Sequence, residues 1–256
     1  LGWESSLRRM TPDEMRTYHR RRYQGPNCCL AVAGDIGDNL VERVVNGPLA
    51  GLDPADDPDP RDAKLPLMTF NSGRDCIRFP RLEAARILMV WTVAAASDHL
   101  EVAGADLATT VLADGRRSRL VEHLREELQI VESIDMDVTT LELGNLVMLE
   151  ACCPEDQLDR VEEEIRRQLE LTLSTPVIEE EFARAAQLVG NGHRFSLEAP
   201  SSVAATAGSQ TLWGRRRELL APEEDLQHWD ASTLSAGMMP LLLSLIHISE
   251  PTRPLR

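Results

Sequence analysis

A ten-residue segment, residues 53–62, constrains the fold of this chain more than any other part of the sequence. It contains five aspartates and three prolines. Proline removes backbone hydrogen-bond donors and the aspartates repel one another, so this segment can supply neither a core strand nor a core helix. We therefore expect an extended, solvated linker over residues 53–63, which divides the 256 residues into two parts of unequal length.

The part before the linker is predicted to contain a helix, a strand and a second helix. The first helix should start at Pro12 and be capped by Thr11, with Glu14 completing a capping box. A short continuous apolar run follows, which is typical of a buried strand. The first helix is expected to reach about residue 24, the strand to cover 28–33, and the second helix to cover 38–49.

The part after the linker is predicted to be an α+β domain. Strands are expected at 75–79, 85–93, 130–140 and 146–152, and helices at 101–113 and 118–129, with further helices starting near 154, 175 and 202. On the helix that starts near 154, Glu162 with Arg166 and Glu163 with Arg167 are spaced for ion pairs. Strands that are joined by short turns indicate an antiparallel sheet with helices on one face.

The composition excludes several classes of function. The chain has 27 Lys and Arg residues against 42 Asp and Glu residues, which gives a formal charge of −15. Lys64 is the only lysine, and no Gly-rich loop ends in Gly-Lys-Ser or Gly-Lys-Thr, so the sequence holds no P-loop. An acidic chain with few aromatic residues lacks the cationic and stacking side chains of nucleic-acid binders. No apolar run is long enough to span a bilayer.

Cysteines and histidines give no strong metal signature. The five cysteines, at positions 28, 29, 76, 152 and 153, are expected to be small buried side chains on strands, without disulfides. No HExxH or HxxEH occurs. The nearest pattern is His123 with Glu126 and Glu127, which we interpret as a solvated helix face rather than a metal site. The arginines beside His19 are interpreted as an exposed basic turn rather than a phosphate site.

Two stretches of the sequence carry a family resemblance. The first comprises Leu1-Gly2, Met10 to Met15, Tyr23 to Asn27 and the apolar run that ends in Ala33-Gly34-Asp35; the second comprises Leu112 to Leu120 and Leu124-Arg125-Glu126. Together they resemble the pitrilysin/insulinase-type zinc metallopeptidases, in the branch that includes mitochondrial processing peptidase and its bacterial relatives. The resemblance covers roughly residues 1–242 and implies a two-domain unit.

The resemblance also implies a division of the chain. Residues 1–52 would be the C-terminal part of a first, zinc-type domain, and residues 64–242 a second domain of the inactive type. The HxxEH motif and the zinc ligands would lie upstream of Leu1, outside this chain. Residues 243–256 resemble a translated sequencing adapter and are expected to be an artefact. Because the N-terminus of the protein is expected to be missing, the sequence does not distinguish a cytoplasmic from a periplasmic location.

The function implied by the resemblance is that of a fragment of a zinc-dependent endopeptidase subunit. Such a subunit hydrolyses peptides in a closed chamber formed by a homo- or heterodimer, and the fragment alone is expected to be inactive. Arg125 falls on the position of a substrate-binding arginine, but Glu132 stands where the family often has a tyrosine. Two alternatives remain: a non-catalytic partner subunit of the same fold, and an unrelated α+β domain.

Overall fold

The computed structural model describes residues 3–52, 73–79, 83–215 and 217–243. The chain forms two compact units. Unit 1 comprises Leu1–Lys64 and Arg194–Leu219, and unit 2 comprises Leu65–His193 and Leu220–Arg256. The expected linker at 53–63 lies wholly outside the described residues, as does the expected artefact at 243–256 except for Leu243, the last residue of α10. The assignment of the chain to two family domains stays a prediction.

Unit 2 is built on a three-stranded antiparallel sheet. Its strands are β1 (Ala85–Val93), β2 (Ser133–Thr139) and β3 (Asn145–Cys153), in the order β1-β3-β2. β3 alternates between fully buried and partly exposed side chains, because successive residues of a strand point to opposite faces. The tight turn between β2 and β3 uses Gly144, whose φ of 142° is outside the range that other residues readily adopt.

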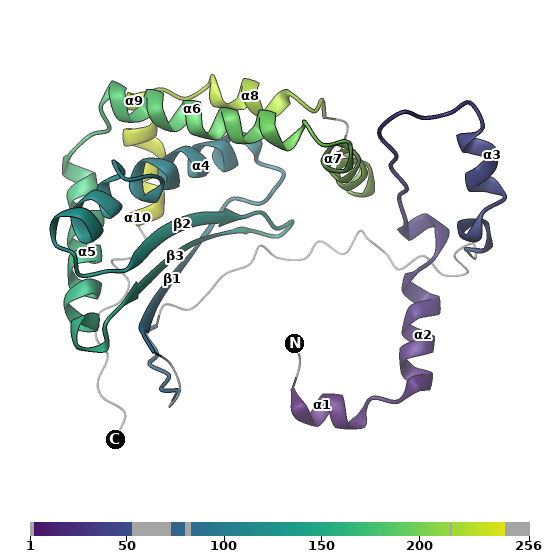
Figure 1. The fold of residues 1–256 in the computed structure, drawn as a ribbon, viewed down its shortest axis with the longest axis horizontal. Coiled ribbons are helices and arrows are strands. Elements are labelled where there is room, and N and C mark those ends of the chain that lie inside the picture. The colour runs from purple at the N-terminus through teal and green to yellow at the C-terminus, as the bar shows by residue number, and fades with distance from the viewer. Residues whose placement is uncertain (1–2, 53–72, 80–82, 216, 244–256) are drawn as a thin grey trace. The chain divides into compact units, whose positions relative to one another are not determined.

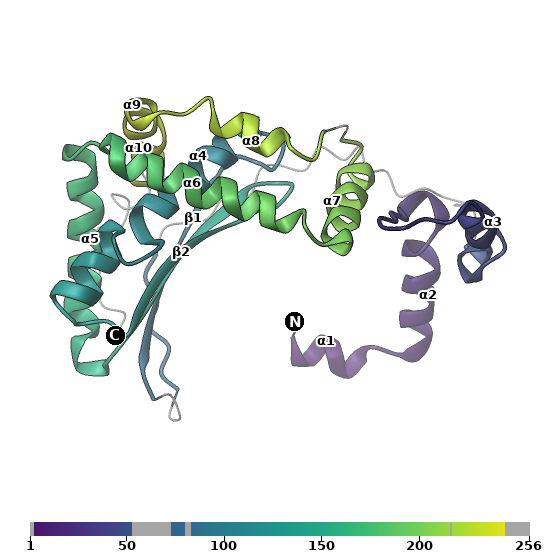
Figure 2. The ribbon, with the colours of Figure 1, turned by 45° about the horizontal axis from the view of Figure 1, so that its top comes forward.

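Helices cover one face of this sheet, with α4 and α6 on the same side in both views (Figures 1 and 2). The α-helices of unit 2 are α4 (His99–Ala113), α5 (Leu158–Ser174), α6 (Glu179–Ser196, which runs into unit 1), α8 (Ala221–Leu226), α9 (Ala231–Thr233) and α10 (Met239–Leu243). Two π-helices, Val121–Glu127 and Leu234–Met238, and a 3₁₀ turn, Glu155–Gln157, lie among them. The expected α+β fold, an antiparallel sheet with helices on one face, is confirmed.

The core of unit 2 lies between the sheet and α4. Leu107 and Val111 of α4, Val147 and Leu149 of β3, and Ile165 of α5 are all fully buried. α4 is buried on nearly every side, which explains its run of small and apolar residues. Burial of this apolar surface is the main stabilising term of the fold.

Unit 1 is predominantly helical among its described residues. Its α-helices are α1 (Glu4–Arg9), α2 (Pro12–Arg22), α3 (Leu40–Val45) and α7 (Pro200–Leu212), with 3₁₀ turns at Gly25–Asn27 and Pro48–Gly51. The predicted capping box of α2 is present. The Glu14 N–H donates to Thr11 Oγ1 at 3.2 Å, and the Thr11 N–H donates to Glu14 Oε2 at 2.7 Å. No described residue of unit 1 is buried.

Two predicted strands are absent. Residues 28–33 and 75–79 form neither a helix nor a strand, and they belong to no sheet of the described part of the chain. A strand needs a neighbour to satisfy its backbone N–H and C=O groups, and an apolar run by itself does not supply one. The predicted burial of the cysteines was consequently wrong for Cys28, Cys29 and Cys76, which are exposed, and right for Cys153.

Several helix boundaries also differ from the prediction. The helix expected from residue 175 begins at Glu179, because the N–H of Val177 donates to Ser235 Oγ at 2.8 Å outside any helix. The region 118–129 forms a π-helix over Val121–Glu127 instead of a regular α-helix. Within the described residues, no helix is both long enough and apolar enough to cross a membrane.

Candidate functional site

The π-helix Val121–Glu127 carries the residue that the sequence singled out for substrate binding. The N–H of Leu128 donates to the carbonyl of His123 at 2.9 Å, five residues back, as a π-turn requires. Gln129 then adopts a left-handed backbone with φ of 52° and ends the segment. The fully buried Leu124 anchors it. π-Turns are rare in proteins, and those that occur are often found at functional sites.

Arg125 projects from this π-helix at the surface, with 45% of its side chain exposed. Among the described residues it forms a long ion pair with the adjacent Glu126, in which Arg125 Nε lies 3.5 Å from Glu126 Oε1. Glu132 lies directly before β2, and its N–H donates to the carbonyl of Cys152 on β3 at 2.8 Å. Arg125 is therefore available to a ligand, while Glu132 offers an acceptor where a tyrosine would offer a hydroxyl donor.

His123 joins the π-helix to α5. Its Nδ1 lies 2.9 Å from Glu127 Oε2, and its Nε2 lies 3.2 Å from Glu164 Oε2 and 3.0 Å from Arg167 Nη2. Arg167 also donates to Glu164 at 2.7 Å. The Arg167 hydrogen bonds hold the pKa of Glu164 below its ordinary value, against a smaller opposing effect of burial. The cluster is a four-residue ionic bridge between two helices.

The helix face that carries His123, Glu126 and Glu127, interpreted from the sequence as solvated, is exposed at Glu127 but part-buried at His123 and Glu126. Glu127 contacts the imidazole, but Glu126 turns away and forms a two-bond ion pair with Arg116, at 2.8 and 3.3 Å. Its pKa is lowered chiefly by that Arg116 hydrogen bond. Glu164, which completes the bridge, lies 41 residues from His123, and no local pattern indicates it.

The described residues do not fit a zinc ion. In the part of the chain that the structure describes, no three His, Cys, Asp or Glu side chains are grouped so that they could hold a metal. In the His123 bridge the two carboxylates contact different ring nitrogens, so they cannot share one ion with either nitrogen. The Arg167 guanidinium beside Nε2 adds a positive charge that further disfavours a cation.

The start of the π-helix is fixed to α6 by Arg119. The Arg119 guanidinium donates to both oxygens of Glu181, at 2.8 and 2.7 Å, and to the carbonyls of Thr175 and Pro176. Burial opposes the ionisation of Glu181, but the bonds from Arg119 and from the Ile178 N–H outweigh it, so its pKa lies below the ordinary value. This bidentate pair is part-buried and rigid, which positions the π-helix relative to α6.

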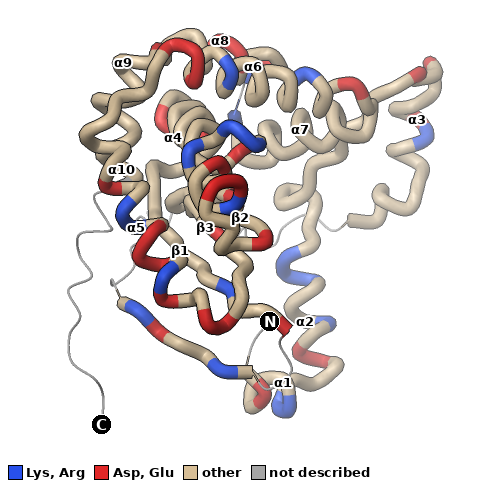
Figure 3. The backbone as a smooth tube through the Cα atoms, turned by 60° about the vertical axis from the view of Figure 1, so that its left-hand side comes forward, with Lys and Arg blue, Asp and Glu red and all other residues tan. Residues whose placement is uncertain are grey.

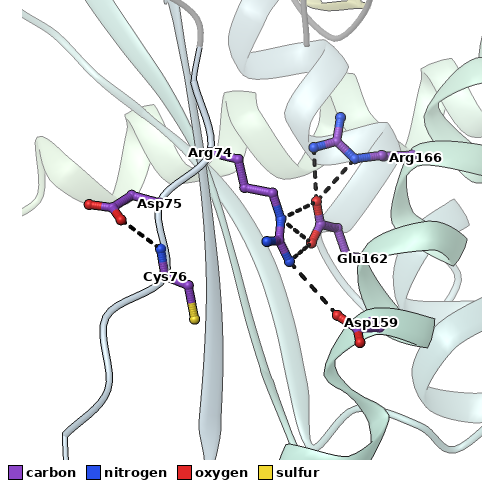
Figure 4. Close-up of polar contacts among 6 residues, drawn as sticks. All are labelled: Arg74, Asp75, Cys76, Asp159, Glu162 and Arg166. Carbon is purple, nitrogen blue, oxygen red and sulfur yellow. Dashed lines mark hydrogen bonds and ion pairs between the residues drawn. The ribbon is translucent and has the colours of Figure 1, made fainter. Parts of the chain in front are cut away.

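A second ionic cluster ties the extended segment before β1 to α5 (Figure 4). Arg74 donates to Glu162 at 2.9 and 3.0 Å and lies 3.8 Å from Asp159. Burial disfavours ionised Glu162, but hydrogen bonds from Arg74 and Arg166 lower its pKa overall. The predicted Glu162–Arg166 pair is present at 3.0 Å.

On the charged face of α5 (Figure 3), Arg167 pairs with Glu164 instead of the predicted Glu163. These contacts join structural elements and assemble no catalytic group. In unit 1, His19 of α2 stacks on Tyr23, the residue that follows the helix, with ring centroids 4.5 Å apart; both residues are exposed.

Comparison with known families matches residues 9–189 to the model of the peptidase M16 inactive domain. Among curated proteins, the chain is 24% identical over 222 residues to an uncharacterised zinc protease of Streptomyces coelicolor. That match covers 84% of this chain and 48% of the relative, so the chain spans about half the length of the curated protein it matches.

Solved structures of the same fold include a protease from Helicobacter pylori, with a TM-score of 0.76 and 15% identity over 92% of this chain and 57% of that one. A chain of complex III2 from Candida albicans matches with a TM-score of 0.53 and 17% identity, over 61% of this chain and 39% of that one. At such identities the likeness shows the fold alone. Domains of this fold thus occur in multi-unit complexes.

Proposed function

Because the chain belongs to the family of the peptidase M16 inactive domain, we propose that it is part of a zinc-dependent endopeptidase subunit and contributes no catalytic residue itself. The observation that carries this proposal is the family match over most of the chain, together with a relative that is named a zinc protease. The zinc ligands would lie in polypeptide outside these 256 residues. There, zinc would polarise the scissile carbonyl and activate a water molecule.

Within this proposal, residues 1–52 complete a first, zinc-type domain and residues 64–242 form a second domain that helps to enclose the substrate. Unit 2 supplies a rigid, helix-backed sheet, and the described residues include no metal-binding cluster. That combination suits a wall of a peptide-binding chamber better than a catalytic centre. The protein would be bacterial and would act in the cytoplasm or the periplasm. Its assembled form would be a dimer of similar units.

Arg125 is the proposed substrate contact in this chain. Its guanidinium carries several donors and is nearly half exposed, and the π-helix that bears it is anchored by Arg119 and His123. It could therefore donate to a peptide carbonyl or pair with a substrate carboxylate. Because Glu132 is an acceptor, it cannot help to polarise a carbonyl, and a partner unit would have to supply that donor.

A second candidate function is that of a non-catalytic partner subunit with the same fold. Glu132 favours it, since the substrate-polarising pair is incomplete here. The two candidates differ in the metal content of the complete protein. A catalytic subunit should bind one zinc per chain and lose peptide cleavage on chelation, whereas a partner subunit should purify without zinc.

The proposal is tested by recovering the coding DNA on both sides of this segment and purifying the extended product. We expect stoichiometric zinc and chelator-sensitive cleavage of unstructured peptides by that product, and no cleavage by the 256-residue chain. An extended reading frame without HxxEH would eliminate the catalytic candidate. Cleavage by the short chain that stops on chelation would contradict the placement of the zinc ligands.

The role of Arg125 is tested by Arg125→Ala in the same extended product. We expect kcat/KM for peptide cleavage to fall about tenfold, the effect of losing one charge-assisted hydrogen bond of about 1.4 kcal/mol. Arg117→Ala is the matched control, because Arg117 is an exposed arginine of the preceding loop outside the π-helix. Equal kinetics for the Arg125→Ala variant and the unsubstituted product would show that Arg125 has no part in substrate binding.

A further inference from the structure

One ring nitrogen of His123 lies between a hydrogen-bond donor and an acceptor. Its Nε2 is 3.0 Å from Arg167 Nη2, which can only donate, and 3.2 Å from Glu164 Oε2, which as a carboxylate oxygen can only accept. An Nε2 without a hydrogen suits the guanidinium and repels the carboxylate, and an Nε2 with a hydrogen does the reverse. No single protonation state of the imidazole therefore satisfies both neighbours.

The other ring nitrogen decides which neighbour each protonation state selects. Nδ1 lies 2.9 Å from Glu127 Oε2, and a carboxylate at that distance requires a hydrogen on Nδ1. A neutral imidazole then has a bare Nε2, which accepts from Arg167. An imidazolium carries a hydrogen on both nitrogens, so its Nε2 donates to Glu164 and the guanidinium has to turn away from the ring.

The two cationic side chains compete for one oxygen of Glu164. Arg167 donates to Glu164 Oε2 from Nε at 2.9 Å and from Nη2 at 2.7 Å, and the same oxygen lies beside His123 Nε2. The Arg167 hydrogen bonds are the main cause that lowers the pKa of Glu164, burial opposes them, and the His123 hydrogen bond lowers the pKa further. Glu164 therefore stays ionised where imidazoles titrate, and its charge is available to either cation.

Three charged groups contact the His123 ring among the described residues. They are Glu127 of its own helix and Glu164 and Arg167 of α5. Neighbouring charged side chains are engaged elsewhere: Glu126 with Arg116, Arg119 with Glu181, and Arg160 with Gln157. The response of this site to protons is thus set by His123 and these three groups.

The strand β2, which also packs against the π-helix, directs its acids away from it. Asp135 and Asp137 are exposed and alternate with buried residues, so they lie on the face of the sheet opposite the helices. Glu132, directly before β2, contacts Cys152 Sγ at 3.7 Å. These acids therefore take no part in the contacts of the imidazole.

Protonation of His123 changes the net charge of the four-residue bridge. Two carboxylates and one guanidinium give a formal charge of −1 with a neutral imidazole and zero with an imidazolium. Hydrogen bonds between charged groups are stronger than neutral ones, and only 20% of the His123 side chain is exposed to screening by solvent. The added stability is present in acid and is lost as pH rises and the imidazole releases its proton.

We propose that His123 is a proton-operated tether of the π-helix: on protonation its Nε2 exchanges Arg167 for Glu164 and holds the π-helix more tightly to α5. The tether does not depend on the peptidase assignment, since all its groups lie in unit 2. Its consequence for Arg125 does rest on the proposed function. Because the same π-helix carries Arg125, substrate binding through Arg125 would strengthen in acid.

Hydrogen exchange of the 256-residue chain at about pH 5 and about pH 8 tests the tether. The opening constant of amides 121–128, corrected for the intrinsic exchange rate at each pH, should be about threefold to fivefold smaller at the lower pH. His123→Asn should abolish this difference. Glu164→Gln, which keeps the imidazole but removes the charge, should remove most of it.

The matched control is His228→Asn, which should keep the full pH response. His228 is an exposed histidine of unit 2 whose Nδ1 lies 3.0 Å from the carbonyl of Glu224. The titration of Asp106 is common to all these proteins, so it cancels when their pH responses are compared. Slow exchange of β3 in the same samples verifies that unit 2 remains folded in each variant.

Nitrogen chemical shifts of the His123 ring give a second reading that needs no substitution. We expect a hydrogen on Nδ1 and none on Nε2 in the neutral form, and hydrogens on both in acid. A neutral ring with its hydrogen on Nε2 would overturn the role of Arg167. A pH response that persists in His123→Asn, or that disappears in His228→Asn, would overturn the tether.

The consequence for Arg125 is measured separately, through KM for peptide cleavage by the extended product. Acid should lower KM more in the unsubstituted product than in its His123→Asn variant. An identical change of KM in both, with the exchange response present in the 256-residue chain, would reject the consequence for Arg125 and keep the tether. An extended product without zinc or cleavage would reject the peptidase and leave the exchange result standing.

Discussion

At the scale of single residues, Asp106 is the least expected side chain of the core. It lies on α4, where residues 103–105 and 107–113 are all buried, and it retains only part of its surface in contact with water. Burial raises the pKa of this carboxyl from 3.8 to about 6, because an ionised group loses solvation there. The sequence pattern does not predict this burial, because a single acidic residue in a helix is common.

The raised pKa of Asp106 makes stability pH-dependent. The folded state holds its proton up to about pH 6, whereas the unfolded chain releases it near 3.8, so the contribution is favourable at low pH and is lost as pH rises through 6. Asp106→Asn should therefore raise the unfolding free energy at pH 8 by at most about 3 kcal/mol, and at pH 4 by no more than about 0.5 kcal/mol. Urea unfolding of both proteins at the two pH values measures this. An equal effect at pH 4 and pH 8 would contradict it.

Gly104 shows how one missing side chain permits a close contact. A Cβ at this position would clash with the Trp229 ring and lie 2.9 Å from Met238 Cε. The Trp229 ring cannot easily move away from α4, because its Nε1–H donates to the carbonyl of Leu100 at 2.9 Å. Gly104→Ala should destabilise unit 2 by roughly 1–3 kcal/mol, despite the better helix propensity of alanine.

Gly192→Ala is the control for this substitution. Gly192 lies in α6, where an added Cβ would meet nothing within 4 Å. The propensity gain should then act alone and leave stability unchanged or up to about 1 kcal/mol higher. Thermal unfolding of the two variants gives the comparison, and a destabilised Gly192→Ala would weaken the steric explanation for Gly104.

At the scale of elements, the π-helix depends on contacts that bring distant segments together. Arg119→Met would leave Glu181 part-buried without its bidentate partner, and we expect a loss of about 2–4 kcal/mol at pH 7. The pKa of Glu181 is lowered by the pair, so this stabilisation is present above the ordinary glutamate pKa and is lost as pH falls below it. Denaturant unfolding at pH 7 and pH 3 measures the change, with the exposed Arg117→Met as control. A loss that persisted unchanged at pH 3 would rule out the ion pair as its cause.

Elements with a strong local pattern were predictable from the sequence. The boundaries of β1 match the prediction, β3 extends it by one residue at each end, and the capping box of α2 is formed as expected. Each of these depends on alternation or capping within a few residues. The ion pair of Arg74 with Glu162 joins positions 88 residues apart, and the π-turn at His123 depends on packing. Neither leaves a local signal.

The candidate site was predictable only in part for the same reason. Arg125 was located through the family resemblance, and its contribution to substrate binding stays a prediction. Its anchors Glu164 and Glu181 belong to other helices, so they become visible only once the chain is folded. The strand expected at 28–33 has the right composition but lacks a neighbouring strand among the described residues. Pairing is a property of the assembled sheet and not of the segment.

At the scale of the whole molecule, the buried side chains of the described residues and the net charge are both concentrated in unit 2. Unit 2 contains all the buried side chains of the described chain and also the entire net charge, so its core must offset the self-repulsion of its surface. Unit 1 has no net charge, and none of its described residues is buried. The net negative charge of the chain thus belongs to the unit that contains the buried core.

This division predicts two separate levels of stability in the isolated 256-residue chain. Amides of β3 should exchange only on global unfolding of unit 2, at a cost of several kcal/mol, because their strand is paired on both sides and buried on one face. Amides of α2 should exchange with an opening free energy near zero, since no residue of that helix is buried and short isolated helices are marginal in water. Native-state hydrogen exchange with peptide-level mass spectrometry measures both. Comparable protection of α2 and β3 in the dilute chain would mean that unit 1 is stabilised without any added polypeptide.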